Sequence, residues 1–177
     1  MDIRFVLASD AQRILKRFSV GMFNEDYKPS YNVSPGDSAY IITSGNPGEI
    51  SLFEFGIKTN KGVSVPFVRA EGDRNEADDI AYNGSKAIFL KPEYKQLIRS
   101  QRCLVLADAF IVGFEYEEPR LVYLRNKKRP FAFAGIYVTY FDSNSGNLVN
   151  SFAIITYTAN KLLQSMGYKR MPVILHQ

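Results

Sequence analysis

The sequence contains no tryptophan, one cysteine and one histidine among its 177 residues. The single thiol, Cys103, excludes an internal disulfide and any zinc site that needs two thiolates. The single histidine, His176, is the penultimate residue, so a histidine-dependent catalytic triad or dyad would have to recruit a terminal side chain. No histidine spacing typical of a metal site is present, and we therefore expect neither a metal nor another cofactor.

Long apolar runs are also absent. No stretch of about 18 apolar residues occurs, so we expect no membrane-spanning helix. The first residues lack a basic segment followed by an apolar one, so no secretory signal is expected and the cytoplasm is the predicted compartment. The length suits one compact domain, which we predict over residues 1–177, with a monomer favoured and the oligomeric state otherwise open.

The charge balance is mildly basic, with a formal net charge of +4. It permits a nucleic-acid partner without establishing one. Basic residues occur in small groups: Arg13, Lys16 and Arg17; Arg99 and Arg102; Arg125, Lys127, Lys128 and Arg129; Lys169 and Arg170. Acidic residues are concentrated between Glu71 and Asp79. Most such groups are solvated surface, so each is a weak indication of function.

Apolar periodicity predicts the elements of an α+β fold. Helices are expected over 11–18, 92–100 and 159–166, the first with a capping box from Ser9 and Gln12 and the last capped by Thr158. Strands are expected at 39–43, 51–57, 103–107, 121–125, 131–140, 151–157 and 171–175, with a hairpin turn at 142–147. Residues 28–37 and 58–87 lack periodicity and are predicted to be irregular. Many strands without strand–helix–strand alternation indicate mostly antiparallel sheet or a barrel with flanking helices.

The residues by themselves indicate little catalytic chemistry. Cys103 lies in the apolar run 103–107, where a buried core thiol is favoured over a nucleophile. Glu71 and Asp73 stand two residues apart and are candidates for acid–base work, although solvent exposure also explains them. Physical reasoning from the sequence therefore reaches an α+β domain compatible with nucleic-acid binding.

Short segments spread along the chain resemble one known family. They are Met-Asp-Ile-Arg-Phe at 1–5, Tyr-Asn-Val-Ser-Pro at 31–35, Phe-Val-Arg-Ala-Glu at 67–71, Arg-Cys-Leu-Val-Leu-Ala-Asp-Ala-Phe at 102–110, Phe-Ala-Gly-Ile at 133–136 and Arg-Met-Pro-Val-Ile-Leu at 170–175. Their order and residue types are similar to those of the SOS-response-associated peptidase (SRAP) family. Family members usually continue further, so we expect the C-terminus to be short by comparison.

The resemblance implies a particular reaction. In the family, removal of the initiator Met exposes a cysteine whose thiol and α-amine condense with the aldehyde of an abasic site in single-stranded DNA. The product is a thiazolidine DNA–protein crosslink. An Asn, a Glu and a His assist, and the same residues are proposed to act in autoproteolysis.

All four of these catalytic positions are substituted in this chain. The cysteine is replaced by Asp2, the Asn by Phe67, the Glu by Val112 and the His by Tyr168. A carboxylate cannot form the thiazolidine ring, and Asp2 also disfavours removal of Met1. Val112 and Phe67 carry no group that transfers a proton. The chain is therefore expected to be catalytically inactive.

The DNA-contacting positions of the family are better kept. Arg4, Asn32, Pro35, Arg69 and Arg170 match it, and Phe55 replaces a Trp that wedges against bases in the family and is expected still to stack. We therefore predict binding of single-stranded or abasic DNA without covalent capture. Three alternatives stay open: Arg4 and Arg170 as structural ion-pair partners, an active enzyme that uses Glu71, Asp73 or Glu115, and a scaffold without a DNA role.

Overall fold

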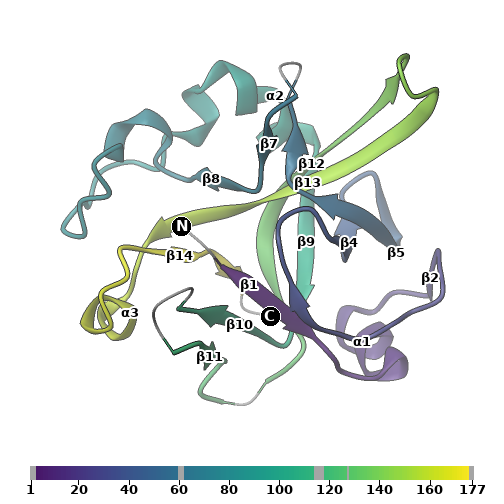
Figure 1. The fold of residues 1–177 in the computed structure, drawn as a ribbon, viewed down its shortest axis with the longest axis horizontal. Helices are drawn as coiled ribbons and strands as arrows, with labels where there is room; N and C mark the ends of the chain where they lie inside the picture. The colour runs from purple at the N-terminus through teal and green to yellow at the C-terminus, as the bar shows by residue number, and fades with distance from the viewer. Residues whose placement is uncertain (1–2, 60–61, 114–117, 127, 176–177) are drawn as a thin grey trace.

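A five-stranded barrel forms the centre of the molecule (Figure 1). The computed structural model describes residues 3–59, 62–113, 118–126 and 128–175. The barrel strands are β4 (Ser38–Thr43), β5 (Asn46–Phe55), β9 (Arg102–Ala107), β12 (Phe131–Asp142) and β13 (Asn147–Thr158). They pair antiparallel in the order β13-β12-β9-β4-β5. The sheet closes where β5 meets β13 in parallel, with Phe55 opposite Phe152.

Shorter strands extend the barrel and form a second sheet. β14 (Arg170–Pro172) and β8 (Phe67–Arg69) pair with β13, β15 (Ile174–Leu175) with β12, and β2 (Met22–Phe23) with β5. The second sheet has the order β11 (Arg120–Val122), β10 (Ala109–Val112), β1 (Arg4–Leu7), β3 (Ser30–Val33). β6 (Ile57–Lys58) pairs with β7 (Ser64–Val65). The α-helices are α1 (Ala11–Phe18), α2 (Pro92–Ser100) and α3 (Lys161–Ser165), and 3-10 turns lie at Gly72–Asn75 and Ile88–Leu90. The predicted α+β class is confirmed.

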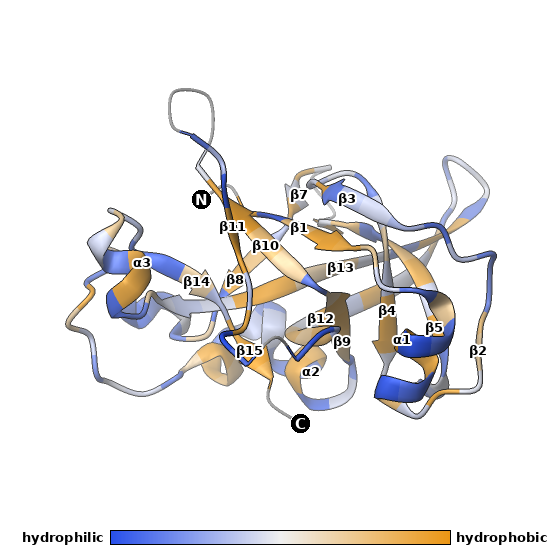
Figure 2. Cartoon of the chain, turned by 90° about the horizontal axis from the view of Figure 1, so that it is seen from below, coloured by the Kyte–Doolittle hydropathy of each residue, from blue (hydrophilic) through white to orange (hydrophobic). Residues whose placement is uncertain are grey.

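Phenylalanine rings fill the barrel and the space between the two sheets. Phe5, Phe55, Phe110, Phe133 and Phe152 are each at most 1% exposed. Their rings meet edge to face or stacked at centroid distances of 5.1 to 6.0 Å. Each buried ring removes a large apolar area from water, and aromatic pairs add about 0.5–1.5 kcal/mol beyond that area. The barrel strands are accordingly the apolar part of the chain, while the loops and the outer face of α1 are polar (Figure 2).

Helix α1 has the predicted bounds, but its predicted cap is wrong. Asp10 is the N-cap residue, and its carboxylate accepts a hydrogen bond from the Arg13 amide at 3.0 Å. Ser9 is unavailable because its hydroxyl donates to Asp108 at 2.6 Å, and Asp108 also accepts from the Ala8 and Ser9 amides. This carboxylate ties the turn before β10 to the start of the helix, and it selects a different cap from the one that the local pattern indicated.

Other departures from the predicted elements are short strands. The segment 28–37 contains β3, the segment 58–87 contains β7 and β8, and β10 was not predicted. The strand predicted at 121–125 runs instead from Arg120 to Val122, and the final strand divides into β14 and β15. α3 is shorter than predicted and is capped by Asn160 rather than Thr158. Strands of two to four residues carry too few alternating positions for periodicity to detect. Among the described residues, no helix is long and apolar enough to cross a membrane.

The thiol of Cys103 lies inside the barrel wall, as the sequence predicted. The residue is 5% exposed, and burial raises the pKa of the thiol well above its ordinary value. Cys103 pairs with Gly135 across β9 and β12, and a Cβ added to that glycine would stand 2.8 Å from the sulfur. The thiolate that alkylating reagents require is therefore disfavoured by desolvation and poorly accessible.

Alkylation of Cys103 should be slow in the folded protein. We expect iodoacetamide to modify the native chain far more slowly than the chain unfolded in urea, with the two followed by intact mass. The unfolded sample is the control for intrinsic reactivity. Rapid stoichiometric modification without loss of the folded circular dichroism spectrum would contradict the burial of this thiol.

Candidate functional site

Strands β8 and β14 flank the C-terminal end of β13 on its two sides. Thr156 of β13 pairs with Arg69 of β8 on one side and with Pro172 of β14 on the other. Arg170, at the start of β14, lies opposite Thr158. The two arginines, 101 residues apart in the sequence (69 to 170), are thereby brought to the same end of one strand.

Both arginines belong to one chain of ion pairs. Arg170 donates to the Glu71 carboxylate at 2.9 Å, to Asp78 at 3.2 Å and to the Thr156 hydroxyl at 3.1 Å. Arg69 forms a bidentate pair with the same Asp78: its Nε donates to Oδ1 at 3.0 Å and its Nη2 donates to Oδ2 at 3.1 Å. Two cations and two carboxylates therefore form a network with no formal net charge.

Burial decides which member of the network can reach a ligand. The side chain of Arg170 is 5% exposed and that of Glu71 is 0% exposed, whereas that of Arg69 is 41% exposed. Arg170 is therefore buried and paired in this structure, in line with the ion-pair alternative that the sequence left open, and its contact with DNA stays a prediction. Arg69 keeps part of its guanidinium on the surface.

The carboxylates of the network are held in their ionised form. Burial of Glu71 opposes ionisation, but the hydrogen bond and the charge of Arg170 outweigh it and lower the pKa of that carboxyl. The hydrogen bond from Arg69, opposed by partial burial, lowers the pKa of Asp78. Neither carboxylate is suited to act as a proton donor or base near neutral pH, because both are stabilised as paired anions.

The aromatic residue expected to stack on DNA bases is part of the core. Phe55 is 0% exposed. Its ring stacks on Phe152 at 5.1 Å with an interplanar angle of 6°, and Phe67 meets it edge-on at 5.4 Å. The ring therefore lies within the barrel packing in this structure, and the stacking of Phe55 against bases stays an untested prediction.

Three of the four family catalytic positions belong to, or pack against, the large hydrophobic core of the barrel. Phe67, Val112 and Tyr168 pack against the same hydrophobic core, Val112 within it at 2% exposure and the other two half-buried at its margin. The Tyr168 hydroxyl lies 3.3 Å from the position that a Cβ on Gly113 would take, beside Val112. The fourth position, Asp2, lies outside the described residues. Of these three side chains, two are apolar and the third is a phenol.

The remaining predicted contact residues lie on and around the second sheet. Arg4 is half-buried on β1, in register with Ile111 of β10. Asn32 is exposed on β3 beside Tyr31, which is 71% exposed. Pro35 is exposed in the turn that follows β3. The Gly36 amide of that turn donates to the Phe55 carbonyl at 2.8 Å, which attaches the turn to the end of β5.

Glu71 and Asp73, the described carboxylates considered as alternative catalytic groups, both form ion pairs. Glu71 is buried against Arg170, and Asp73 is exposed and pairs with Lys91 at 2.7 Å. Glu115, His176 and Lys127 lie outside the described residues. Within the described ranges, no group of three or more His, Cys, Asp or Glu side chains could hold a metal ion.

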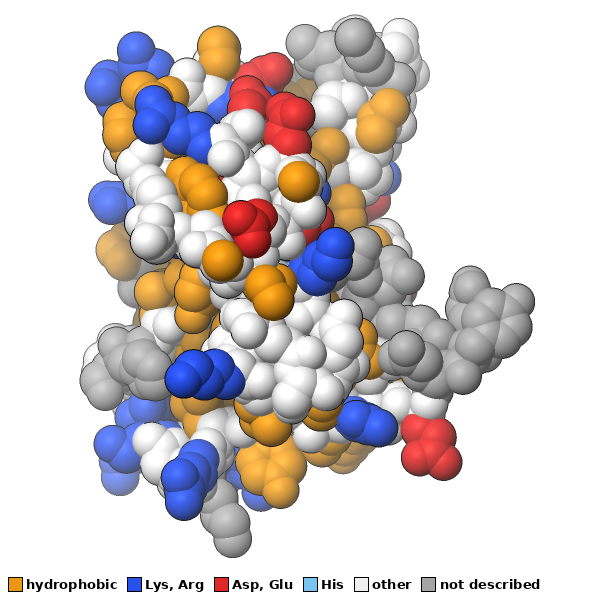
Figure 3. Space-filling view, turned by 90° about the vertical axis from the view of Figure 1, so that its left-hand side faces the viewer, with side chains coloured by type: hydrophobic (Ala, Val, Ile, Leu, Met, Phe, Trp, Pro, Cys, Tyr) orange, Lys and Arg blue, Asp and Glu red, His pale blue; other side chains and the backbone are white. Residues whose placement is uncertain are grey.

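Two partners of the arginines, Asp78 and Thr156, were not identified from the sequence. Asp78 lies in the acidic stretch between Glu71 and Asp79, and its backbone has a positive φ of 53°, a conformation that Asp tolerates better than most residues. The side of the molecule with β8 and β14 carries acidic and basic side chains interspersed rather than in one basic band (Figure 3). Local binding there would depend on a few side chains and not on a broad positive field.

The chain is similar to known proteins along its whole length. The model of the family described as SOS response associated peptidase (SRAP) matches residues 1–177. The abasic site processing protein YoqW of Bacillus subtilis is 29% identical over 177 residues, covering 97% of this chain and 75% of that protein. The abasic site processing protein YobE of the same organism is 26% identical, covering 97% of this chain and 76% of that protein.

Solved structures share the fold. A protein from Bacteroides thetaiotaomicron superposes with a TM-score of 0.73 at 22% identity, covering 98% of this chain and 77% of that chain. A protein from Bordetella bronchiseptica gives the same TM-score of 0.73 at 18% identity, covering 99% of this chain and 84% of that chain.

Removal of the Glu71 charge should destabilise the protein strongly. Glu71→Gln leaves the buried Arg170 guanidinium with one carboxylate instead of two, and we expect a loss of about 3 kcal/mol in the free energy of unfolding. The measurement is urea denaturation followed by circular dichroism. Asp73→Asn is the control, because its exposed pair with Lys91 contributes about 0–1 kcal/mol. Equal stabilities of the two variants would contradict a structural role for the buried pair.

The same network should make stability sensitive to acid. Glu71 and Asp78 have folded-state pKa values below their ordinary values of 4.5 and 3.8, so the unfolded chain binds protons more readily than the folded one. Their contribution is complete above the ordinary values and is lost as the pH falls through the folded-state values. The stability difference between wild type and Glu71→Gln should therefore shrink between about pH 6 and about pH 3. A difference independent of pH would contradict the ion-pair assignment.

Proposed function

This chain belongs to the SOS-response-associated peptidase (SRAP) family, and from that premise we propose that it binds single-stranded DNA at abasic sites without forming a covalent crosslink. The family and the abasic site processing proteins among its relatives support a role in the response to DNA damage. The proposal that binding is noncovalent rests on one observation. Phe67, Val112 and Tyr168, at three of the four family catalytic positions, pack within or against the hydrophobic core.

The chemistry of these side chains explains the loss of capture. Crosslinking needs a 1,2-aminothiol together with groups that move protons during imine formation and ring closure. Asp2 supplies no thiol, and Phe67 and Val112 have no titratable group. Tyr168 offers a phenol, which is a poor base at neutral pH, and the nearby carboxylates Glu71 and Asp78 are committed to arginines.

Binding is assigned to the residues that remain on the surface. Arg69 presents part of its guanidinium, and Asn32 and Pro35 are exposed near the end of β5. We assign the stacking role expected of Phe55 to Tyr31, because its ring is 71% exposed and adjacent to Asn32. Arg4 lies half-buried on the neighbouring strand β1 and completes the proposed contact set.

Crosslinking should be absent. Abasic single-stranded DNA mixed with this chain should give no product that survives denaturing electrophoresis, while a family member with an intact Met-Cys start serves as the positive control. Asp2→Cys should restore partial capture at best, because Phe67, Val112 and Tyr168 still lack the proton-transfer groups. Efficient crosslinking by the unaltered chain would contradict the proposal and show that the chain is an active enzyme.

Noncovalent binding should depend on Tyr31. Stacking of a base on an aromatic ring contributes about 1–3 kcal/mol, so Tyr31→Ala should weaken binding roughly ten-fold or more. Fluorescence anisotropy with a labelled single-stranded oligonucleotide measures the effect. Tyr140→Ala, at a ring that is 39% exposed on the β12–β13 hairpin, is the matched control. If the wild-type chain shows no binding even at low salt, the DNA-binding function fails and the scaffold alternative is correct.

A further inference from the structure

A second basic surface lies between α1 and the segment 128–130. A cleft of about 510 Å³ is present there, and the described residues that line it are all cationic: Arg13, Lys16, Arg17, Lys128 and Arg129. Arg13, Lys16 and Arg17 are spaced i, i+3 and i+4, so they project from one face of the helix. The last two come from a part of the chain more than 110 residues away (Arg17 to Lys128), so the cluster is a product of the fold.

Two of the arginines are held in place by backbone carbonyls. The Nε of Arg13 donates to the Arg129 carbonyl at 3.1 Å, and the Nε of Arg17 donates to the Pro130 carbonyl at 3.2 Å. These bonds orient the guanidinium groups and consume one donor each. Among the described residues, the terminal nitrogens of these two arginines make no hydrogen bond to the protein. They suit the paired oxygens of a phosphate, and a preoriented guanidinium loses less entropy on binding.

No ion pair within the described part of the chain joins the cluster to a carboxylate, although Asp108 lies beside Arg129 in the adjoining pocket. None of the five side chains has a carboxylate within ion-pairing distance there, in contrast to Arg69 and Arg170. Four of the five are exposed and Arg17 is half-buried. Unpaired like charges repel one another, so an anion in the cleft would relieve a cost that the folded chain carries.

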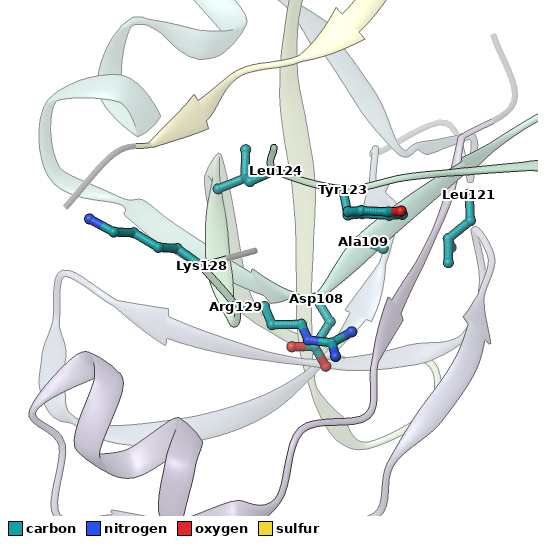
Figure 4. Close-up of a pocket in the computed structure, with 7 residues that line it drawn as sticks. All are labelled: Asp108, Ala109, Leu121, Tyr123, Leu124, Lys128 and Arg129. Atoms are coloured by element: carbon teal, nitrogen blue, oxygen red, sulfur yellow. The ribbon is translucent and has the colours of Figure 1, made fainter. Parts of the chain in front are cut away.

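An adjoining pocket adds apolar surface. It has a volume of about 300 Å³, shares Lys128 and Arg129 with the basic cleft, and is also lined by Leu121 and Tyr123, which are 55% and 58% exposed. In Figure 4 the Arg129 side chain extends toward Asp108, and Lys128 and Tyr123 lie on opposite sides of the pocket. Cationic side chains next to an exposed aromatic ring suit single-stranded nucleic acid, whose phosphates and bases both find partners.

The cleft lies at the far end of the molecule from the ion-pair network of Arg69 and Arg170. Figures 1 and 2 place α1 at the end opposite α3, β8 and β14. We propose that the face formed by Arg13, Lys16, Arg17, Lys128 and Arg129 binds the phosphodiester backbone of single-stranded DNA outside the abasic site. This inference rests on the proposed function and extends it from one contact region to two.

The test neutralises two charges that have no structural partner. Lys16→Gln with Lys128→Gln is preferred to changes at Arg13 or Arg17, because both lysines are exposed and their amines take part in no hydrogen bond among the described residues. Lys95→Gln with Arg99→Gln is the matched control: it removes the same charge from α2, where both residues are also exposed. Thermal unfolding of both variants should equal that of wild type.

Binding of a long single-stranded oligonucleotide is measured by anisotropy over a range of salt concentrations. Each lost phosphate contact should reduce the slope of log affinity against log salt by about 0.7 and weaken binding roughly five-fold at 0.1 M salt. We therefore expect the Lys16/Lys128 variant to lose about 1.4 in slope and the control variant to match wild type.

The outcomes separate the two proposals. If wild type does not bind, the proposed function fails. If wild type binds and the Lys16/Lys128 and Lys95/Arg99 variants behave alike, the cleft proposal fails while the proposed function stands. A loss seen with duplex DNA and not with the single strand would overturn the assignment to single-stranded backbone.

Discussion

The buried guanidinium of Arg170 constrains the structure around the candidate site more than any other single group. A charge that is 5% exposed must be paired and hydrogen-bonded, and Glu71, Asp78 and Thr156 provide those partners. The ion pairs of Arg170 with Glu71 and Asp78 hold the acidic segment 71–79 against the end of β13. They also orient Arg69, because Arg69 pairs with the same Asp78. Because the network is neutral overall, the arginines stabilise this end of the fold, and only Arg69 keeps surface that a ligand can reach.

The apolar residues at the family catalytic positions have a consequence for the packing of the core. Phe67 extends the aromatic packing of the barrel through its edge-to-face contact with Phe55, and Val112 adds a buried aliphatic side chain to the same core. A polar catalytic group at the same margin would have needed hydrogen-bond partners or water. The strand framework accommodates these apolar side chains, and it agrees with two solved structures at a TM-score of 0.73.

The cationic residues discussed above fall into two groups, one paired with carboxylates and one not. Arg69 and Arg170 are matched by carboxylates, whereas the cluster between α1 and the segment 128–130 is not matched within the described part of the chain. Neutral networks contribute stability and position, while unneutralised clusters contribute long-range attraction for anions. The distinction explains why a count of basic residues, or the net charge of +4, does not by itself locate an anion-binding surface.

The sequence by itself determined the elements whose signal is local. α1, the long strands β9, β12 and β13 with their hairpin, and the burial of Cys103 follow from periodicity over many neighbouring positions. The family resemblance likewise identified which positions of the site had changed. Only the tertiary structure decided the cap of α1, the burial of Phe55 and the structural role of Arg170. Each depends on a partner far away in the sequence: Ser9 is taken by Asp108, 99 residues distant, and Arg170 by Glu71, also 99 residues distant. Such partners are selected by the packing of the whole chain, and local patterns carry no information about them.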